Sequence, residues 1–238
     1  MLSAVAIIPT APVLDPELAG AAAAEVADLA AAVLAAAALL PERWVVVGTG
    51  SADDVLGPDS PERGPLTGTF AGFGADVAVR LSPQQARDPV ELPVDFPLCA
   101  LVAAWVRGQA RPGASAQIHV YRSDHDADTA LACGRQLRAE IDQAPDPTGV
   151  LVVADGANTL TPAAPGGYHP DDVAAQRVLD DALASGDVAA LARLPEQILG
   201  RVAFQVLAGL IEPGPRSVKE LYRGAPYGVG YFAGAWQP

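Results

Sequence analysis

Short runs of β-branched and aromatic residues alternate along this chain with longer segments of helical pattern. Three such runs cover residues 44–47, 117–121 and 150–153, and each follows or precedes a helical segment. Strands that alternate with helices form sheets whose two faces are covered, because each crossover lays a helix on the sheet. The pattern therefore predicts an α/β protein with a central, mostly parallel or mixed sheet and helices on both faces.

The Ala-rich stretch 18–40 has the composition of a membrane span, but it carries Glu25 and Asp28 inside it. Its larger apolar residues recur close to helical spacing, with Ala filling the gaps. Asp15 as N-cap and Pro16 at the first helical position mark a helix start. We therefore expect one long amphipathic helix packed on the sheet.

Apolar periodicity predicts four further helices, at residues 97–108, 126–141, 171–185 and 196–211. Ser123 or Asp124 is expected to cap the first turn of the second, and Gly186 to end the third. The last helix is apolar nearly all round, so it should lie centrally. The Pro- and Gly-rich stretch 57–68 is the best candidate for a long exposed loop.

The chain has 238 residues and is 50% hydrophobic, which suits a single domain over residues 1–238. Its formal net charge of -13 argues against nucleic acid or an anionic membrane as partner, since both attract basic clusters. The first apolar run lacks a preceding basic segment and is broken by Pro9 and Pro12, so we expect a cytoplasmic protein. Cys99 and Cys133 lie far apart in apolar or helical contexts, and we expect both to be buried, reduced thiols.

Five segments carry motifs that occur in order along almost the whole chain. Residues 5–17 run from an apolar strand through Pro-Thr-Ala-Pro to Asp-Pro-Glu, and residues 68–75 read Gly-Thr-Phe-Ala-Gly-Phe-Gly-Ala. Residues 94–98 read Val-Asp-Phe-Pro-Leu, and residues 150–168 run from a strand through Ala-Asp-Gly-Ala-Asn to a Gly-Tyr pair. Residues 225–231 read Ala-Pro-Tyr-Gly-Val-Gly-Tyr. Together these segments resemble the class III extradiol dioxygenase subunit-B-like family, and the resemblance implies that family's α/β fold.

In that family the chemistry depends on Fe(II) held by two His and one carboxylate, with open positions for a catechol-type substrate and dioxygen. The aligned positions of this chain do not supply those ligands. Thr10 or Ala11 stands at the first His, residues 48–51 read Gly-Thr-Gly-Ser at the second, and residues 197–201 carry no carboxylate. The positions of the non-ligand catalytic His residues read Phe96 and Asn158. The resemblance therefore implies a member that has lost its Fe(II) site, and we expect no cofactor.

Three histidines are the remaining imidazoles that could hold a metal. His119 lies in the middle of a predicted strand, which is typical of a histidine on a sheet face. His125 lies among aspartates spaced as in a calcium loop, but Thr129 and Arg135 stand where such a loop needs Gly and Glu. That cluster favours a helix start, where acids meet the positive end of the helix dipole. His169 follows Tyr168 in a predicted loop, so we expect no new metal site from the three.

If the fold resembles the family's, a cleft lies at the strand ends and in the loops after them. The residues expected to line it are Thr10, Thr49, Ser51, Asp155, Asn158, Tyr168 and Arg201. Asp155 is its main remaining charge and needs donors, for which Arg201 or backbone N–H groups are the candidates. Gln197, Arg201 and Gln205 form a polar stripe that faces either the cleft or an internal network.

Three functions are compatible with these residues. The leading one is a metal-independent small-molecule-binding or interaction protein on a dioxygenase scaffold. The alternative is an active extradiol ring-cleavage dioxygenase or related oxidoreductase that uses non-standard ligands or a partner subunit. A hydrolase built around Ser51 comes third, because no Gly-x-Ser-x-Gly turn surrounds that residue. The apolar segment 231–236 would be costly to expose, so we also expect a symmetric homodimer.

Overall fold

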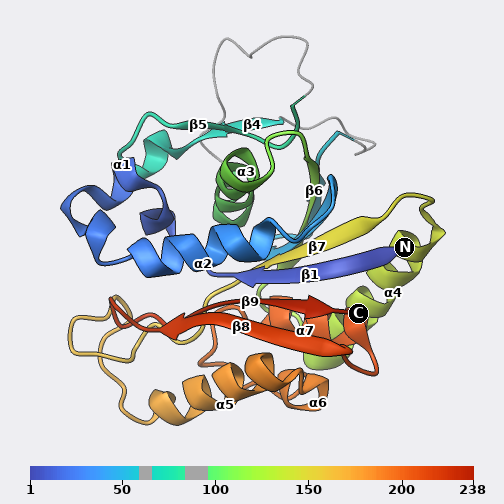
Figure 1. The fold of residues 1–238 in the computed structure, drawn as a ribbon. Helices are drawn as coiled ribbons and strands as arrows, with labels where there is room; N and C mark the ends of the chain where they lie inside the picture. The colour runs from blue at the N-terminus through green and yellow to red at the C-terminus, as the bar shows by residue number, and fades with distance from the viewer. Residues whose placement is uncertain (59–65, 84–95) are drawn as a thin grey trace.

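A seven-stranded mixed sheet forms the centre of the molecule, with helices on both of its faces (Figure 1). The structure is a computed structural model that describes residues 1–58, 66–83 and 96–238. The strand order is β3-β6-β2-β7-β1-β9-β8, and a separate two-stranded sheet pairs β4 with β5. The strands are β1 Leu2–Ile8, β2 Arg43–Gly50, β3 Asp54–Leu56, β4 Thr67–Thr69, β5 Ala78–Arg80, β6 Ser115–Arg122, β7 Thr148–Val153, β8 Ser217–Gly224 and β9 Tyr231–Gln237.

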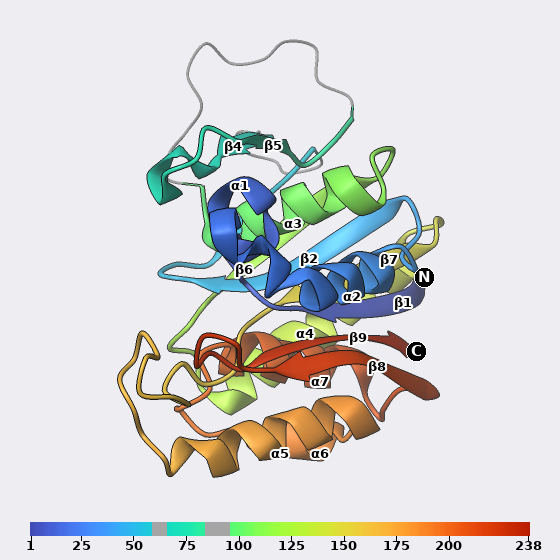
Figure 2. The same cartoon turned by 60° about the vertical axis from the view of Figure 1, so that its left-hand side comes forward.

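The helices divide into two layers, and two views of the ribbon agree on this division (Figures 1 and 2). One layer holds α1 Pro16–Ala19, α2 Ala27–Ala37 and α3 Leu98–Ala110, together with the short 3-10 turns η1 Pro12–Leu14, η2 Gly20–Ala24 and η3 Phe70–Phe73. The opposite layer holds α4 Ala127–Gln143, α5 Asp172–Ser185, α6 Val188–Leu191 and α7 Arg201–Ile211. The fold class predicted from the alternating pattern is therefore confirmed.

The four central strands β6, β2, β7 and β1 are parallel, whereas β3 and the β8–β9 pair are antiparallel additions at the two edges. Side chains of β1 alternate between the layers. Ala6 and Ile8 pack in the core under α2 and α3, and Val5 and Ile7 in the core over α4, α5 and α7. Both faces of the central strands are buried, which explains why they are apolar runs rather than alternating ones.

The predicted apolar runs lie inside β2, β6 and β7, and three predicted helices correspond to α3, α4 and α5 within two residues at each end. The side chain of Asp15 accepts a hydrogen bond from the N–H of Glu17, as expected of an N-cap. Gly186 ends α5 with a φ of 74°, a left-handed conformation that glycine adopts without strain. Local signals thus placed most of these elements correctly.

The prediction of one long helix over residues 18–40 is wrong. The first helix ends after one turn at Gly20, which has a φ of 53°, and a 3-10 turn separates it from α2. A left-handed residue redirects the backbone, so the helical hydrogen-bond ladder cannot continue through it. The Ala-rich pattern has strong helix propensity on both sides of this break, which is why periodicity alone overlooked it.

The predicted start of the late helix is also wrong. Residues 196–200 lie outside α7, because the N–H of Gly200 donates to the carbonyl of Asp155 at 2.8 Å and the N–H of Leu199 to that of Gly156 at 3.2 Å. These tertiary bonds replace the first helical turn. The N-cap of α4 differs as well: Asp126, rather than Ser123 or Asp124, accepts from the N–H of Thr129 at 2.7 Å.

Helices α4 and α7 pack with their backbones in direct contact. A Cβ atom on Gly134 would overlap the carbonyl oxygen of Val206, and one on Gly209 would overlap that of Leu131. Glycine is costly inside a helix by itself, so its presence at these two positions follows from the close approach. The apolar α7 lies buried between α4 and the sheet, as its composition predicts.

The C-terminal apolar segment is buried within the subunit. Residues 231–236 belong to β9, which lies between β1 and β8, and the indole N–H of Trp236 donates to the carbonyl of Leu183 at 3.0 Å. The cost of exposing this segment is therefore no argument for a homodimer, and the homodimer stays a prediction. Of the predicted loop 57–68, residues 59–65 lie outside the described residues, and Gly68 at its end is buried in β4 rather than exposed.

The thiols differ from each other in exposure. Cys99 is buried, as predicted, whereas Cys133 on α4 is only partly buried, so the prediction of a buried thiol there is wrong. Within residues 1–58, 66–83 and 96–238, no helix has the length and apolar character needed to cross a bilayer.

Candidate functional site

The carboxyl ends of the parallel strands meet at one edge of the sheet, where the chain leaves adjacent strands in opposite directions. After β1 it passes to the layer of α2, and after the neighbouring β7 it passes to the layer of α5 (Figure 1). Such a divergence between adjacent strands opens a crevice, and ligands of open α/β sheets bind in crevices of this kind. A ligand site is therefore expected between the ends of β1 and β7.

Asp155 lies at this point, two residues beyond the end of β7. Its Oδ1 accepts a hydrogen bond from the backbone N–H of Thr10, just beyond β1, at 2.7 Å. In the described part of the chain, Oδ2 has no hydrogen-bond partner, and no fully buried side-chain oxygen or nitrogen lacks one. Oδ2 is therefore reached by solvent, and it is a carboxylate oxygen open to a ligand.

The environment of Asp155 favours its protonated form. Burial raises the pKa of the Asp155 carboxyl group to about 6, and the N–H of Thr10 acts in the opposite direction. Among the residues that the structure describes, no Lys or Arg side chain contributes to this pKa, so none of them acts as a counter-ion to the carboxylate. A carboxyl group that titrates near neutral pH in a crevice is a functional candidate.

The loop that carries Asp155 is held on both sides. Gly156 and Ala157 exchange backbone hydrogen bonds of 2.8 Å with Gly230, and the N–H of Ala157 donates to the side-chain oxygen of Gln176 at 2.8 Å. Gln176 is buried on α5 and fills the space that a Cβ on Gly156 or Gly230 would need. The position of Asp155 is thus set by α5 and the β8–β9 turn as well as by β7.

Tyrosines from the C-terminal hairpin lie on the same side of the sheet as Thr10. Tyr231 is buried, and besides burial the charge of Asp155 raises its pKa, which places the two side chains near each other. The hydroxyl group of Tyr227 donates to the carboxylate of Glu25 at 3.4 Å. Glu25 lies between η2 and α2, so this contact joins residues 202 positions apart in the sequence.

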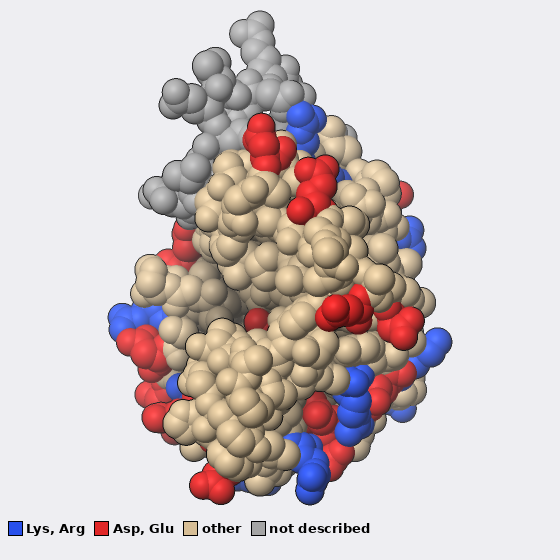
Figure 3. Space-filling view, turned by 90° about the vertical axis from the view of Figure 1, so that its left-hand side faces the viewer, with Lys and Arg blue, Asp and Glu red and all other residues tan. Residues whose placement is uncertain are grey.

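The face with the carboxyl ends of the strands is hollowed (Figure 3). The walls of the hollow are mostly uncharged, and acidic atoms are visible at its floor. Lys and Arg side chains lie toward the margins of this face. A different hollow, of about 650 Å³, lies at the opposite edge of the sheet, between Arg43, Ser115 and Pro147, and contains none of the predicted site residues.

The other predicted site residues are distributed around the same edge of the sheet. Thr49 is half-buried near the end of β2, and Ser51 is exposed just beyond that strand. Asn158 is half-buried in the loop after β7, and Tyr168 is exposed later in the same loop, at 51% of its full area. Thr10 and Asp155 are the pair that a direct hydrogen bond joins.

The side chain of Arg201 donates hydrogen bonds to groups inside the protein rather than to Asp155. Its guanidinium group donates to Oε1 of Gln205 at 3.1 Å and to the carbonyl of His125 at 3.1 Å, and Gln205 in turn donates to the carbonyl of Ala192 at 3.3 Å. Of the two explanations for the polar stripe, an internal network is the one observed for Arg201 and Gln205. Gln197 is exposed outside the helix, and the donor to Asp155 is a backbone N–H.

The histidines lie apart from one another. His119 is half-buried on β6 and stacks on Tyr121, with ring centroids 6.4 Å apart. The ring of His125 is 2.9 Å from the carboxylate of Asp53, and His169 is exposed in the loop after β7. Among the residues placed by the structure, no group of three or more His, Cys, Asp or Glu side chains is arranged to hold a metal ion.

Sequence reasoning missed the pairing of Asp53 with His125. Partial burial raises the pKa of Asp53, but hydrogen bonds from the N–H of Arg122 and from His125 outweigh it and hold that pKa below its usual value. The pair ties the loop after β2 to the loop after β6. No sequence signal identified it, because the two residues lie 72 positions apart.

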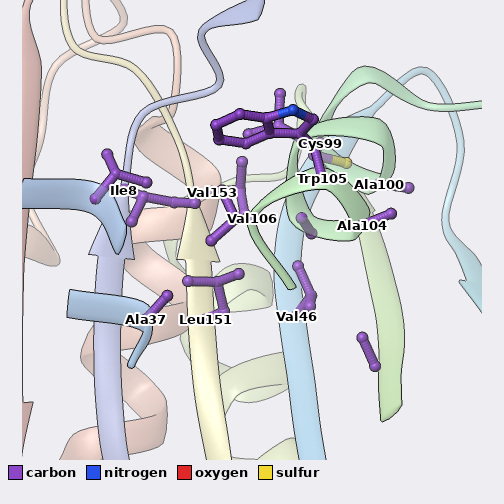
Figure 4. Close-up of a cluster of buried hydrophobic side chains, with 14 of the residues drawn as sticks. Ile8, Ala37, Val46, Cys99, Ala100, Ala104, Trp105, Val106, Leu151 and Val153 are labelled. Atoms are coloured by element: carbon purple, nitrogen blue, oxygen red, sulfur yellow. The ribbon is translucent and has the colours of Figure 1, made fainter. Parts of the chain in front are cut away.

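Cys99 belongs to the core rather than to the site. It packs among apolar side chains between α3 and the sheet (Figure 4), and a Cβ on Gly48 of β2 would overlap its side chain. Burial raises the pKa of its thiol to about 11, so the reactive thiolate form is suppressed.

No protein-family model matches this chain, and no curated protein sequence matches it. A solved structure does: the crystal structure of uncharacterized protein JW3007 from Escherichia coli K12 is similar over 98% of this chain and 99% of that one, with a TM-score of 0.56. The two sequences are 9% identical, so the likeness concerns the fold. It supports the α/β architecture and its mixed central sheet.

Proposed function

We propose that this chain is a metal-independent small-molecule-binding protein whose ligand occupies the hollow at the carboxyl edge of the sheet. The observation that carries the proposal is the open Oδ2 of Asp155, located where the chain diverges after β1 and β7. An ionisable group without a counter-ion reduces stability at neutral pH, and such groups persist where they serve a ligand.

The scaffold that we propose is the one resembled by the sequence, that of the class III extradiol dioxygenase subunit-B-like family. In this proposal Thr10 and Thr49 occupy positions where that family has metal-ligand segments. Hydroxyl side chains are poor replacements for imidazole at Fe(II), so ligand binding through Asp155 would stand in place of metal chemistry.

The first test is a fragment screen followed by amide shifts in two-dimensional NMR spectra. We expect fragments to shift the amides of Thr10, Asn158 and Tyr231, because these flank Asp155. The variant Asp155→Ala should lose the shifts, whereas Asp124→Ala, on an exposed ion pair with Arg122, should keep them. A screen in which no fragment affects these amides would remove the proposal.

The second test is elemental analysis of protein purified without chelator. We expect far less than one equivalent of iron, zinc or manganese, because the aligned positions lack the imidazole and carboxylate ligands. A stoichiometric metal that EDTA removes with loss of stability would instead support the alternative, an oxidoreductase with non-standard ligands or a partner subunit.

A second candidate function is an enzyme that uses the same site. A carboxyl group with a pKa of about 6 is suited to move a proton near neutral pH, so Asp155 would act as a general acid or base. Turnover of a bound fragment, lost in Asp155→Asn with binding retained, would select this candidate.

A further inference from the structure

The carboxyl edge of the sheet carries two acidic groups. Oδ2 of Asp155 is open at this edge, and Glu25, at the η2–α2 junction, accepts a hydrogen bond from Tyr227. Acidic atoms are visible at the floor of the hollow in this face of the molecule (Figure 3). Within the part of the chain that the structure describes, neither carboxylate is in an ion pair. The described residues therefore supply no ion pair that would balance these two carboxylates.

The same region contains aromatic side chains. Tyr222, Tyr227 and Tyr231 come from the β8–β9 hairpin and pack at the margin of the core under α2 and α3. Besides burial, the charges of Tyr227 and Tyr222 raise the pKa of Tyr231, so the three rings form one group. A carboxylate next to tyrosine rings is the combination that attracts an ammonium group, through an ion pair and through the negative faces of the rings.

We propose that the hollow recognises compact molecules that carry an ammonium group, with the cation on Oδ2 of Asp155 and its organic part against the tyrosines. This inference rests on the proposed function and names the class of ligand. A neutral hydroxyl group would make one hydrogen bond to Asp155 without balancing its charge. A carboxylate ligand would add a further negative charge beside it.

The experiment is calorimetric titration with three probes of one shape: phenethylamine, 2-phenylethanol and phenylacetate. We expect phenethylamine to bind about tenfold more tightly than 2-phenylethanol, because a hydrogen bond between charged groups exceeds one with a neutral donor by about this factor. Phenylacetate should be the weakest of the three. Asp155→Asn should remove the preference for the amine, and Asp124→Asn should leave it unchanged.

The pH dependence in the unmodified protein is an independent measurement. Affinity for phenethylamine should rise as pH increases from 5 to 8, because Asp155 loses its proton across this range while the amine remains charged. This pH titration does not depend on the folding of any variant. An affinity for the amine that stays flat with pH, or equals that of the alcohol, would overturn the inference.

The outcomes separate this inference from the function on which it rests. Fragments that shift the amides around Asp155 but are neutral or anionic would overturn the ammonium preference and leave the binding function standing. If no fragment and no probe affects those amides, both proposals fail.

Discussion

The α4–α7 interface and the hollow around Asp155 differ in how completely their groups are used. In the interface two glycines bring the helix backbones into contact. At the start of α7 the Arg201 guanidinium group donates hydrogen bonds to two acceptors. At Asp155, Oδ2 has no hydrogen-bond partner among the described residues, and burial raises the pKa of the carboxyl group to about 6. Selection for stability explains the α4–α7 interface but not the unpaired carboxylate of Asp155. This difference is the physical reason for the functional role proposed for Asp155.

The largest expected effect tests how tightly the interface is packed. Gly209→Ala should lower the free energy of unfolding by about 3 kcal/mol, because the added Cβ meets the backbone of Leu131, which cannot move alone. Gly108→Ala on α3 is the matched control, since its Cβ would meet nothing within 4 Å. Urea denaturation measures both. Equal stability of the two variants would mean that the helices are not in close backbone contact.

A smaller effect is expected where the two regions adjoin, at Arg201. Arg201→Ala should reduce the free energy of unfolding by about 2 kcal/mol, because the carbonyl of His125 and the side chain of Gln205 lose a charged donor. Arg177→Ala, on the exposed face of α5, should change it by less than about 0.5 kcal/mol. If thermal melts of the two variants coincide, the internal network contributes nothing to stability.

At Asp155 we expect a substitution to raise the stability of the protein rather than to lower it. The pKa of Asp155 rises from 3.8 unfolded to about 6 folded, so the folded state binds more protons between these values and stability falls as pH rises through them. Asp155→Asn removes this loss and should stabilise the protein at pH 7.5 by about 1–2 kcal/mol. At pH 4 the two proteins should be nearly equal. Denaturation at both pH values checks this, and a variant less stable than the parent at pH 7.5 would contradict it.

The smallest effect is expected at the exposed end of the packed region. Asp126→Ala removes the N-cap of α4 and should cost about 1 kcal/mol, because the N–H of Thr129 then bonds only to water. Asp128→Ala in the same first turn offers a control, with a dipole contribution of about 0.3–1 kcal/mol. Chemical denaturation that shows no loss in Asp126→Ala would place the cap elsewhere, at Ser123 or Asp124.

The candidate site could be predicted only in part. Thr10 and Asp155 were expected together because each follows a strand, and parallel strands end at one edge. The role of Arg201 stayed open between cleft and internal network, because a side chain of that length reaches either and only its packed neighbours decide. Tyr227 and Tyr231 were not identified as site residues, since their approach to Glu25 and Asp155 depends on pairing at the far end of the chain.

The sequence by itself determined what short-range physics controls. Apolar runs such as residues 150–153, the cap at Asp15 and the stop at Gly186 depend on neighbouring residues, so a linear pattern is sufficient. Tertiary structure decided where α7 begins, because bonds from residues 199 and 200 to the loop after β7 replace a helical turn. It also decided that β9 lies beside β1, and that Asp155 meets the N–H of Thr10 with no basic partner among the described residues. These outcomes depend on contacts between distant segments, whose free energy appears only when the whole sheet is assembled.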